Sequence, residues 1–266
     1  MKVYISADIE GMAGVTTWSE TEKTNSDYPV FLKQMEREVS AACKGALNGG
    51  AREIWVKDAH DSARNIDPAV LPKAAKIIRG WSGHPFAMVQ ELDESFDALI
   101  FIGYHSRSGS NHNPLSHSMN SSEINYIKIN DRYASEFLIH AYAAATVDVP
   151  VVFLSGDKGL CDEVKEINEN ISTLAVKEGV GNSTISIQSE LAAELTEKKV
   201  GEALRSKMDL CRIELPDSFE VEISYSKHIK AYRASFYPGM ELIEPTKVLF
   251  KTKDYFEVLR MILFVV

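Results

Sequence analysis

Residues 96–105 read Phe-Asp-Ala-Leu-Ile-Phe-Ile-Gly-Tyr-His, a nearly continuous apolar run that stops at His105. A run of this kind is typical of a strand covered on both faces, as in the parallel sheet of an α/β protein. Lys2–Ile9 also reads as a strand and carries Asp8 at its end, and Glu53–Ala59 leads straight into His60. The sequence thus predicts three strands that each end in a residue able to bind a metal ion.

Helical patterns alternate with these strands. Apolar residues recur at helical spacing from Pro29 to Leu47, and Gly49-Gly50 ends that helix. The later expected elements are a strand at 124–129, helices at 134–147, 161–168 and 189–208, and strands at 149–154 and 173–177. This alternation predicts the α/β fold class, with a central, mostly parallel sheet flanked by helices.

The last fifty residues change character. Strands are expected at 219–225 and 247–251 with a turn at Pro238-Gly239 between them, and a final helix begins near Asp254. We therefore expect residues 1–215 to form an α/β catalytic core that contains the metal site. Residues 216–266 are expected to form a smaller α+β segment, either as an appendage or as part of the same domain.

The composition excludes several classes of function. The formal charge of -9 over 266 residues argues against a general nucleic-acid binder, which normally carries a basic surface. The three cysteines form no CxxC pair, so neither a disulfide framework nor a thiolate zinc site is indicated. Asp8 and Glu10 interrupt any signal-peptide core, and Met261–Val266 is far shorter than the ~20 residues of a membrane span. We expect a cytoplasmic protein with neither nucleic-acid nor membrane partners.

The placement of acidic and histidine residues is the most informative feature. In open α/β sheets, ligands bind at the carboxyl ends of the strands, where Asp8, Glu10, His60 and His105 are expected to meet. Asp8 and Glu10 alternate with Ile9, so their carboxylates face one side and repel unless a proton or cation lies between them. Taken singly, each residue is more simply a solvated acid or a surface histidine. Their convergence from three segments favours a metal site.

Further candidates lie later in the chain. Glu136 opens a helix, where it either binds metal or complements the helix dipole. His140, one turn further on, is expected to pack behind the site. His117 lies in a polar loop of the kind that carries catalytic groups, and His112 in the same loop is a rival. Asp58, two residues before His60, is a carboxylate of the type that fixes a ligand's second ring nitrogen.

Five blocks together resemble the D-aminopeptidases of the dipeptide-transport-operon type. The blocks keep the family's order and approximate spacing over residues 1–180, and weaker similarity extends nearly to the end of the chain. They are Tyr4-Ile-Ser-Ala-Asp-Ile-Glu-Gly-Met-Ala-Gly14, Lys57-Asp-Ala-His-Asp-Ser62, Gly103-Tyr-His105, Ser116-His-Ser-Met119 and Ile129-Asn-Asp-Arg132 followed by Glu136. Departures are Ser135, where relatives have Gly, Lys57, where Asn is usual, and a longer loop at 107–115.

The resemblance implies a site and an assembly. It implies two zinc ions per chain, a catalytic histidine at His117, and a homo-oligomer described as a decamer of two stacked five-membered rings. The positions of the metal ligands fall on Asp8, Glu10, His60, His105 and Glu136. Five nitrogen and oxygen ligands exceed the four of a structural zinc, and they suit two metals about 3.5–4 Å apart with Asp8 as the bridge.

We therefore expect a zinc-dependent aminopeptidase that hydrolyses the amino-terminal bond of short peptides, with a D-residue such as D-Ala at that end. We expect His117 to act as acid or base, with a nucleophilic role as the alternative. One rival function is a binuclear metal phosphoesterase, for which only Arg107 and Arg132 lie near enough in sequence to hold phosphate. Another rival is a non-catalytic scaffold that binds metal or peptide.

Overall fold

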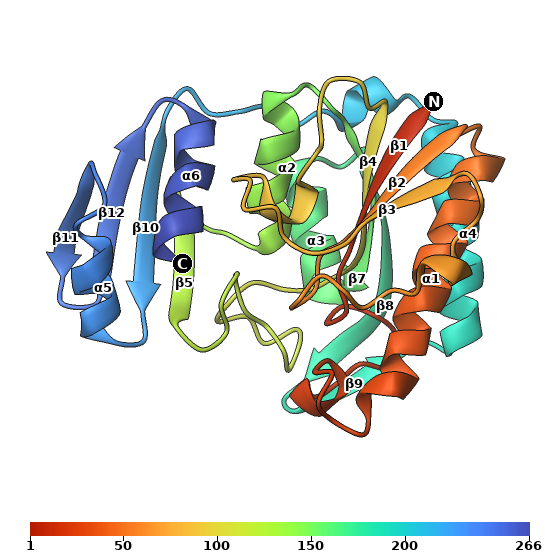
Figure 1. Cartoon of the computed structure of the whole chain (residues 1–266), viewed down its shortest axis with the longest axis horizontal. Coiled ribbons are helices and arrows are strands. Elements are labelled where there is room, and N and C mark those ends of the chain that lie inside the picture. Colours follow the sequence, from red (N-terminus) through yellow and green to blue (C-terminus); the bar gives the residue numbers. More distant parts are fainter.

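The computed structural model describes all 266 residues, which form two sheets with helices around and between them (Figure 1). The larger sheet has the strand order β3-β2-β1-β4-β7-β8-β9 and is parallel except for the β8–β9 pair. Its strands are β1 (Lys2–Ala7), β2 (Glu53–Asp58), β3 (Ala75–Ile78), β4 (Ala98–Tyr104), β7 (Val151–Asp157), β8 (Ser172–Val180) and β9 (Ser183–Ser186). The predicted α/β class with a mostly parallel central sheet is confirmed.

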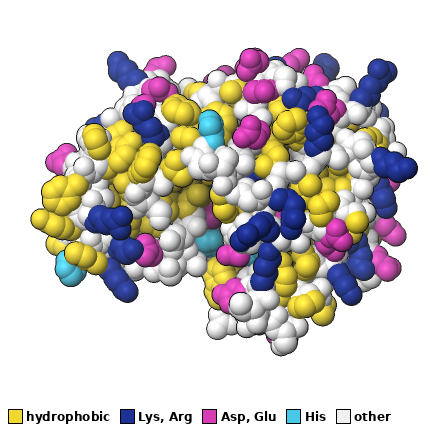
Figure 2. Space-filling model, viewed as in Figure 1, with side chains coloured by type: hydrophobic (Ala, Val, Ile, Leu, Met, Phe, Trp, Pro, Cys, Tyr) yellow, Lys and Arg dark blue, Asp and Glu magenta, His cyan; other side chains and the backbone are white.

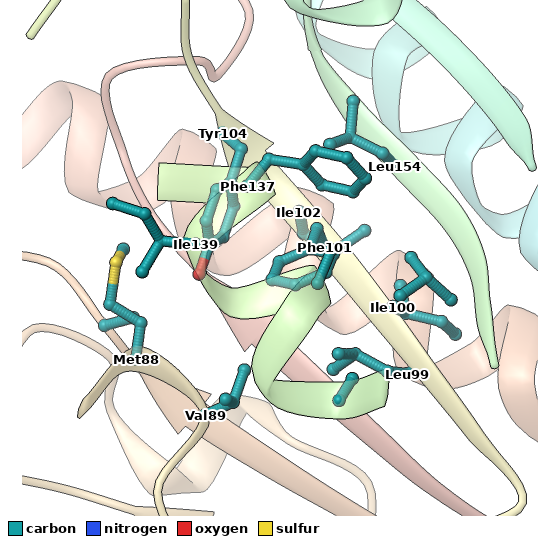
Figure 3. Close-up of a cluster of buried hydrophobic side chains, with 14 of the residues drawn as sticks. Met88, Val89, Leu99, Ile100, Phe101, Ile102, Tyr104, Phe137, Ile139 and Leu154 are labelled. Atoms are coloured by element: carbon teal, nitrogen blue, oxygen red, sulfur yellow. The ribbon is translucent and has the colours of Figure 1, made fainter. Parts of the chain in front are cut away.

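Helices cover both faces of this sheet (Figure 1). The pair α1 (Tyr28–Asn48) and α4 (Ser189–Leu204) packs on one face, and α2 (Glu136–Thr146) and α3 (Lys158–Ile167) lie on the other. Every residue of β4 is buried, as its apolar run predicts. Figure 3 shows β4 side chains packed against α2, where the rings of Phe101 and Phe137 lie 5.3 Å apart. The core therefore fixes the start of α2 relative to β4.

The smaller sheet is antiparallel, in the order β11-β12-β10-β5-β6. Its strands are β5 (Ile124–Ile129), β6 (Arg132–Tyr133), β10 (Phe219–Tyr225), β11 (Met240–Glu244) and β12 (Lys247–Thr252). Helix α6 (Tyr255–Val265) lies between this sheet and α2, while α5 (His228–Ala234) contacts β10, β11 and β12. The segment 216–266 thus completes its sheet with two strands from within residues 1–215. The boundary at residue 215 stays a prediction.

Short elements account for most differences from the expected pattern. The sequence did not predict five short elements, which are β3, β6, β9, β11 and α5. The expected helix 189–208 ends at Leu204, and a separate 3-10 turn follows at Met208–Cys211. Further 3-10 turns lie at Trp18–Glu20, Pro68–Val70 and Ala87–Val89. None of the helices combines the length and apolar character needed to cross a bilayer.

The order of the strands creates a crevice at the carboxyl ends of β1 and β4. From β1 the chain proceeds to β2 and β3 on one side, and it then returns to place β4 on the other side of β1. Such a reversal is the place where ligands bind in open α/β sheets, because the connections leave in opposite directions. The segments that follow β1, β2 and β4 meet around this crevice.

Candidate metal centre

The structure brings all five expected ligands together. Asp8 and Glu10 follow β1, His60 follows β2, His105 follows β4, and Glu136 is the first residue of α2. None of them is more than 7% exposed. Burial of three carboxylates in one place is unfavourable unless protons or cations compensate their charge. The convergence expected from the strand ends is therefore present as a buried, polar cluster.

One half of the cluster is centred on His60. Its Nδ1 lies 3.1 Å from Glu10 Oε2 and 3.3 Å from Asp8 Oδ1. The second carboxylate oxygen of Asp8 points the other way and lies 3.5 Å from Nε2 of His105. Asp8 therefore faces both halves of the cluster, as a bridging carboxylate would.

The other half contains His105, Glu136 and His117. Nε2 of His105 lies 3.5 Å from Glu136 Oε2, and Nε2 of His117 lies 3.5 Å from Glu136 Oε1. The two imidazole rings are stacked, with centroids 4.2 Å apart and an interplanar angle of 11°. The backbone N–H of Met119 also donates to Glu136 Oε1 at 2.7 Å. His117 is thus within reach of the same space as the expected ligands.

Backbone carbonyls fix the tautomer of each histidine. His60 donates from Nε2 to the carbonyl of Thr21, and His105 donates from Nδ1 to that of Ser106, each at 2.9 Å. His117 donates from Nδ1 to the carbonyl of Leu115 at 2.9 Å. The remaining nitrogen of each ring faces the carboxylates. This is the arrangement of histidines that bind metal, where a second partner orients the ring.

The donor set fits divalent metal ions. Glu10 Oε2 and His105 Nε2 are buried and have no hydrogen-bond partner. Burial and the neighbouring Glu10 raise the pKa of Asp8 to about 8. Burial lowers the pKa of His105, but Glu136 and Asp8 outweigh it and raise that pKa to about 10. Without a cation, the groups of this cluster therefore bind protons. A metal ion would displace those protons when it binds.

Two glycines allow β1 and β4 to approach at the site. A Cβ on Gly11 would collide with the carbonyl of Tyr104, and a Cβ on Gly103, at φ +70°, would collide with the carbonyl of Asp8. Gly11 also donates its N–H to the carbonyl of Gly103 at 2.8 Å. The glycines beside the ligands are needed for close backbone contact.

Three buried residues that the sequence reading did not select hold the loops in place. The carbonyl of Glu10 accepts from Asn113 Nδ2 at 3.0 Å and from Lys177 Nζ at 2.5 Å. Asp157 accepts from the backbone N–H of Ser106 at 2.6 Å and from Asn113 Nδ2 at 3.1 Å. Asp157 also caps α3. Asp157 follows the expected strand at 149–154, as the ligand residues follow their strands, whereas Asn113 lies in a polar loop without such a signal.

Comparison with known proteins decides the family. The M55 peptidase family model, described as D-aminopeptidase, matches residues 1–264. The chain belongs to this D-aminopeptidase family. It is 32% identical to a D-aminopeptidase of Bacillus subtilis (strain 168) over 259 residues, which are 97% of this chain and 93% of that protein. The predicted resemblance and the prediction of an aminopeptidase, a hydrolase of peptide bonds, are confirmed.

A solved structure of a D-aminopeptidase has the same fold. It is the Zn-dependent D-aminopeptidase DppA from Bacillus subtilis, described as a self-compartmentalizing protease. The match has a TM-score of 0.93 at 30% identity and covers 100% of this chain and 96% of that chain. The larger lobe, built on the seven-stranded sheet, and the smaller lobe, built on the five-stranded sheet, therefore both belong to a known peptidase fold.

A cavity of about 760 Å³ opens onto this candidate metal centre. Figure 2 shows the surface hollowed between the two halves of the molecule, with acidic and histidine side chains inside the hollow. The side chains of Trp18 and Trp81 line the cavity, and its carboxylates are those of Asp8, Glu10, Glu22, Asp61 and Glu136. No Lys or Arg lines it.

The other candidate residues lie outside this centre. Asp58 does not hold the His60 ring, because its carboxylate accepts from the backbone N–H groups of Asn65 and Ile66 at 2.5 and 2.8 Å. His112 is exposed and is not part of the cluster. His140 is buried and donates to the carbonyl of Glu136 at 2.7 Å, so it packs against the first turn of α2.

Ser135, a departure from the family pattern, has a local role in this chain. Its hydroxyl caps α2 by accepting from the N–H of Leu138 at 3.2 Å, and it donates to Glu163 at 2.7 Å. A serine cap fixes the first turn of a helix. Ser135 thereby places Glu136 at the site.

Proposed function

We propose that this member of the D-aminopeptidase family is a zinc enzyme that removes the amino-terminal residue from short peptides, with D-residues such as D-Ala accepted at that position. One observation carries the proposal. Two groups of nitrogen and oxygen donors lie at the strand ends, Asp8, Glu10 and His60 in one and His105, His117 and Glu136 in the other. Asp8 contacts the histidines of both groups, and two buried atoms, Glu10 Oε2 and His105 Nε2, have no hydrogen-bond partner. The Zn-dependence stated for the DppA structure supports zinc as the metal.

The five residues predicted from the sequence would hold two zinc ions per chain. Glu10 and His60 would bind one ion, His105 and Glu136 would bind the other, and Asp8 would bridge them. When bound, the metal ions polarise the scissile carbonyl and acidify a water molecule. The fixed ring tautomers keep a nitrogen lone pair of each ligand histidine directed at the site.

His117 would move the proton. Its Nδ1–H is committed to the carbonyl of Leu115, so Nε2 is the atom that can accept a proton and deliver it to the leaving amine. Burial and the adjacent His105 lower the pKa of His117. The neutral ring is the form that can act as a base. Trp18 contacts the ring at 5.3 Å between centroids and restricts its movement.

The charge of the cavity supports a peptide substrate over a phosphoester. The lining carries no Lys or Arg to hold a phosphate group. Glu22 and Asp61 are carboxylates beyond the proposed zinc ligands, and they can attract the cationic amino terminus of a peptide. The two arginines that could have served a phosphoesterase are engaged elsewhere. Arg107 lies over the ring of Tyr133 at 4.4 Å, and Arg132 pairs with Glu166 at 3.4 Å.

Metal content and a peptide panel test this function. Purified protein should bind up to two zinc ions per chain by mass spectrometry, and chelation should abolish hydrolysis of dipeptides that begin with D-Ala. His60→Ala and His105→Ala should each lower the zinc content. Full zinc occupancy with both histidines replaced would refute the ligand assignment. A zinc-loaded protein that cleaves no D- or L-aminopeptide would instead favour the binding scaffold.

We further propose a cytoplasmic homo-oligomer, a decamer by family resemblance. The description of DppA as self-compartmentalizing supports assembly. Large apolar side chains also lie exposed on the smaller lobe, as the left half of Figure 2 shows. Phe236 and Phe264 are 71% and 70% exposed there. The three cysteines are all free thiols, as is usual in a reducing compartment.

A further inference from the structure

Trp81 is a large aromatic residue held at the wall of the cavity. It follows β3, lines the cavity, and is 43% exposed. Its indole N–H donates to the carbonyl of Asp61 at 2.8 Å, and Asp61 is the residue directly after His60. The edge of the ring is therefore tied to the segment that carries a metal ligand.

Lys57 holds the same ring from the interior. Its side chain is fully buried, its Nζ donates to the carbonyl of Gly80 at 2.7 Å, and it lies 3.9 Å from the centroid of the Trp81 ring. No carboxylate lies within 4.0 Å of it to form an ion pair. A buried ammonium without a counter-ion is unfavourable, and here one carbonyl and an aromatic face are its partners.

The two loops that carry this arrangement are cross-linked and conformationally restricted. Gly80 donates its N–H to the carbonyl of Ala63 at 2.6 Å, and Ser82 donates its N–H to Gln90 Oε1 at 3.2 Å. Asp61 and Ala63 both have positive φ angles, 46° and 54°. Such conformations in residues other than glycine persist only where surrounding contacts enforce them, and they cluster at functional sites. The indole is thus presented by a rigid wall.

We propose that Trp81 is a substrate-contact residue whose indole packs against an apolar side chain of the bound peptide, and that Lys57 is the positioning residue for that ring. The inference deepens the proposed function and rests on it. Most other groups that line this cavity are polar, and five are carboxylates. Trp81 therefore supplies an apolar surface that selects short peptides with apolar side chains.

Dipeptides that begin with D-Ala and differ only in their second residue, glycine, leucine or phenylalanine, test this role. Trp81→Ala should raise KM about 10-fold for the leucine and phenylalanine substrates, the scale of discrimination expected from an apolar contact. KM for the glycine substrate, kcat and zinc content should stay within about twofold of the parent values. Trp81→Phe keeps an apolar ring and should fall between the parent and the alanine variant.

Lys57→Met tests the positioning role, because methionine fills the buried space without the charge. It should raise the same two KM values about threefold alone and add nothing in a Trp81→Ala background, since coupled residues are not additive. Lys76→Met is the matched control, because Lys76 lies 4.9 Å from the ring of Trp55, outside the cavity. It should leave selectivity unchanged.

The possible failures are distinguishable. A zinc-loaded parent that hydrolyses no aminopeptide overturns the proposed function and this inference together. An active parent whose Trp81→Ala and Trp81→Phe variants keep all three KM values overturns the role of Trp81 alone. A Lys57→Met effect that persists in the Trp81→Ala background overturns the positioning role.

Discussion

At the scale of single residues, His117 stands between two chemical roles. It is stacked on His105, faces Glu136, and is fixed in one tautomer by Leu115. A proton carrier and a metal ligand would both place Nε2 at this point. The geometry therefore makes the replacement of His117 the most informative single change in the site.

His117→Ala should keep both zinc ions and lose about 10²–10⁴-fold in turnover, the usual contribution of a general acid or base. KM should change little, because the ring acts in the transition state rather than in binding. Zinc analysis and steady-state kinetics on a D-Ala dipeptide check this. Loss of one zinc would instead make His117 a ligand, and an acyl-histidine trapped by rapid quench would make it a nucleophile.

Glu38 gives a prediction about stability and pH. Burial raises the pKa of this carboxyl to about 7 from the ordinary value of 4.5, against hydrogen bonds from Gln34 and from the backbone of Ala13. Between these pH values the folded protein retains a proton that the unfolded chain has released, so raising the pH favours unfolding. The contribution of Glu38 to the free energy of unfolding is complete below pH 4.5. It falls by about 3 kcal/mol as the pH rises through 7.

Glu38→Gln should remove that part of the pH dependence. The free energy of unfolding in urea, measured in chelator from pH 4 to 8, should fall less steeply for the variant than for the parent. Both proteins are measured at equal salt. They share all their other titrating groups, so these groups contribute equally to the two curves. Parallel curves for the two proteins would show that Glu38 does not change its protonation on unfolding.

At the scale of elements, the sequence predicted the strands and helices that have a regular pattern of apolar residues. Runs of apolar residues predicted the parallel sheet. The polar residues at the strand ends identified Asp8, His60 and His105 as candidate ligands. The sheet partner of β5 could not be predicted, because antiparallel pairing with β10 joins segments far apart in the chain. The Asn130-Asp131 turn between β5 and β6 was readable, since both residues adopt positive φ angles that suit a tight hairpin.

The contacts of the residues that support the site could not be predicted either, because they also join segments far apart in the chain. Lys177 binds the carbonyl of Glu10 across 167 residues, and Asp157 binds Ser106 across 51. No periodicity marks such a contact. The completed fold identifies these contacts.

Lys177→Met should weaken zinc binding by about 10–100-fold, the usual effect of losing a residue that supports a metal ligand. The variant keeps the length of the side chain but leaves the carbonyls of Glu10 and Val15 without this donor. Competition with a fluorescent chelator measures the affinity. Lys199→Met is the control, because Lys199 donates only to the carbonyl of Thr173 at 3.2 Å, on the same strand. Equal zinc affinities in the two variants would contradict the supporting role of Lys177.

At the scale of the whole molecule, the smaller lobe presents apolar side chains that a monomer would leave in water. Exposed aromatic residues grouped in this way are typical of protein interfaces. They lie on α5, α6 and the segment that follows α5, while the proposed metal centre lies at the edge of the other sheet. Assembly through the smaller lobe would leave each cluster intact.

Phe236→Glu together with Phe264→Glu should shift the protein to a smaller particle in light scattering while its zinc content stays unchanged. A charge buried at an interface without a partner opposes association. Ile185→Glu, on the exposed β9 strand of the larger lobe, is the control and should leave the particle size unchanged. A parent protein that is already monomeric at micromolar concentration would contradict the proposed oligomer.

The pairing of β5 with β10 also has a consequence for synthesis. Ile129 lies opposite Val221, so β5 lacks this partner until the ribosome has made most of the chain. Until then only β6 can pair with it, and a two-stranded hairpin alone is marginally stable. The loop that carries His117 leads into β5. Contacts of Ser106 and Asn113 with Asp157 can hold its first part early, whereas the strand at its other end pairs with β10 late. A growing chain would therefore contain all five proposed metal ligands before the strand that follows the His117 loop gains its lasting partner.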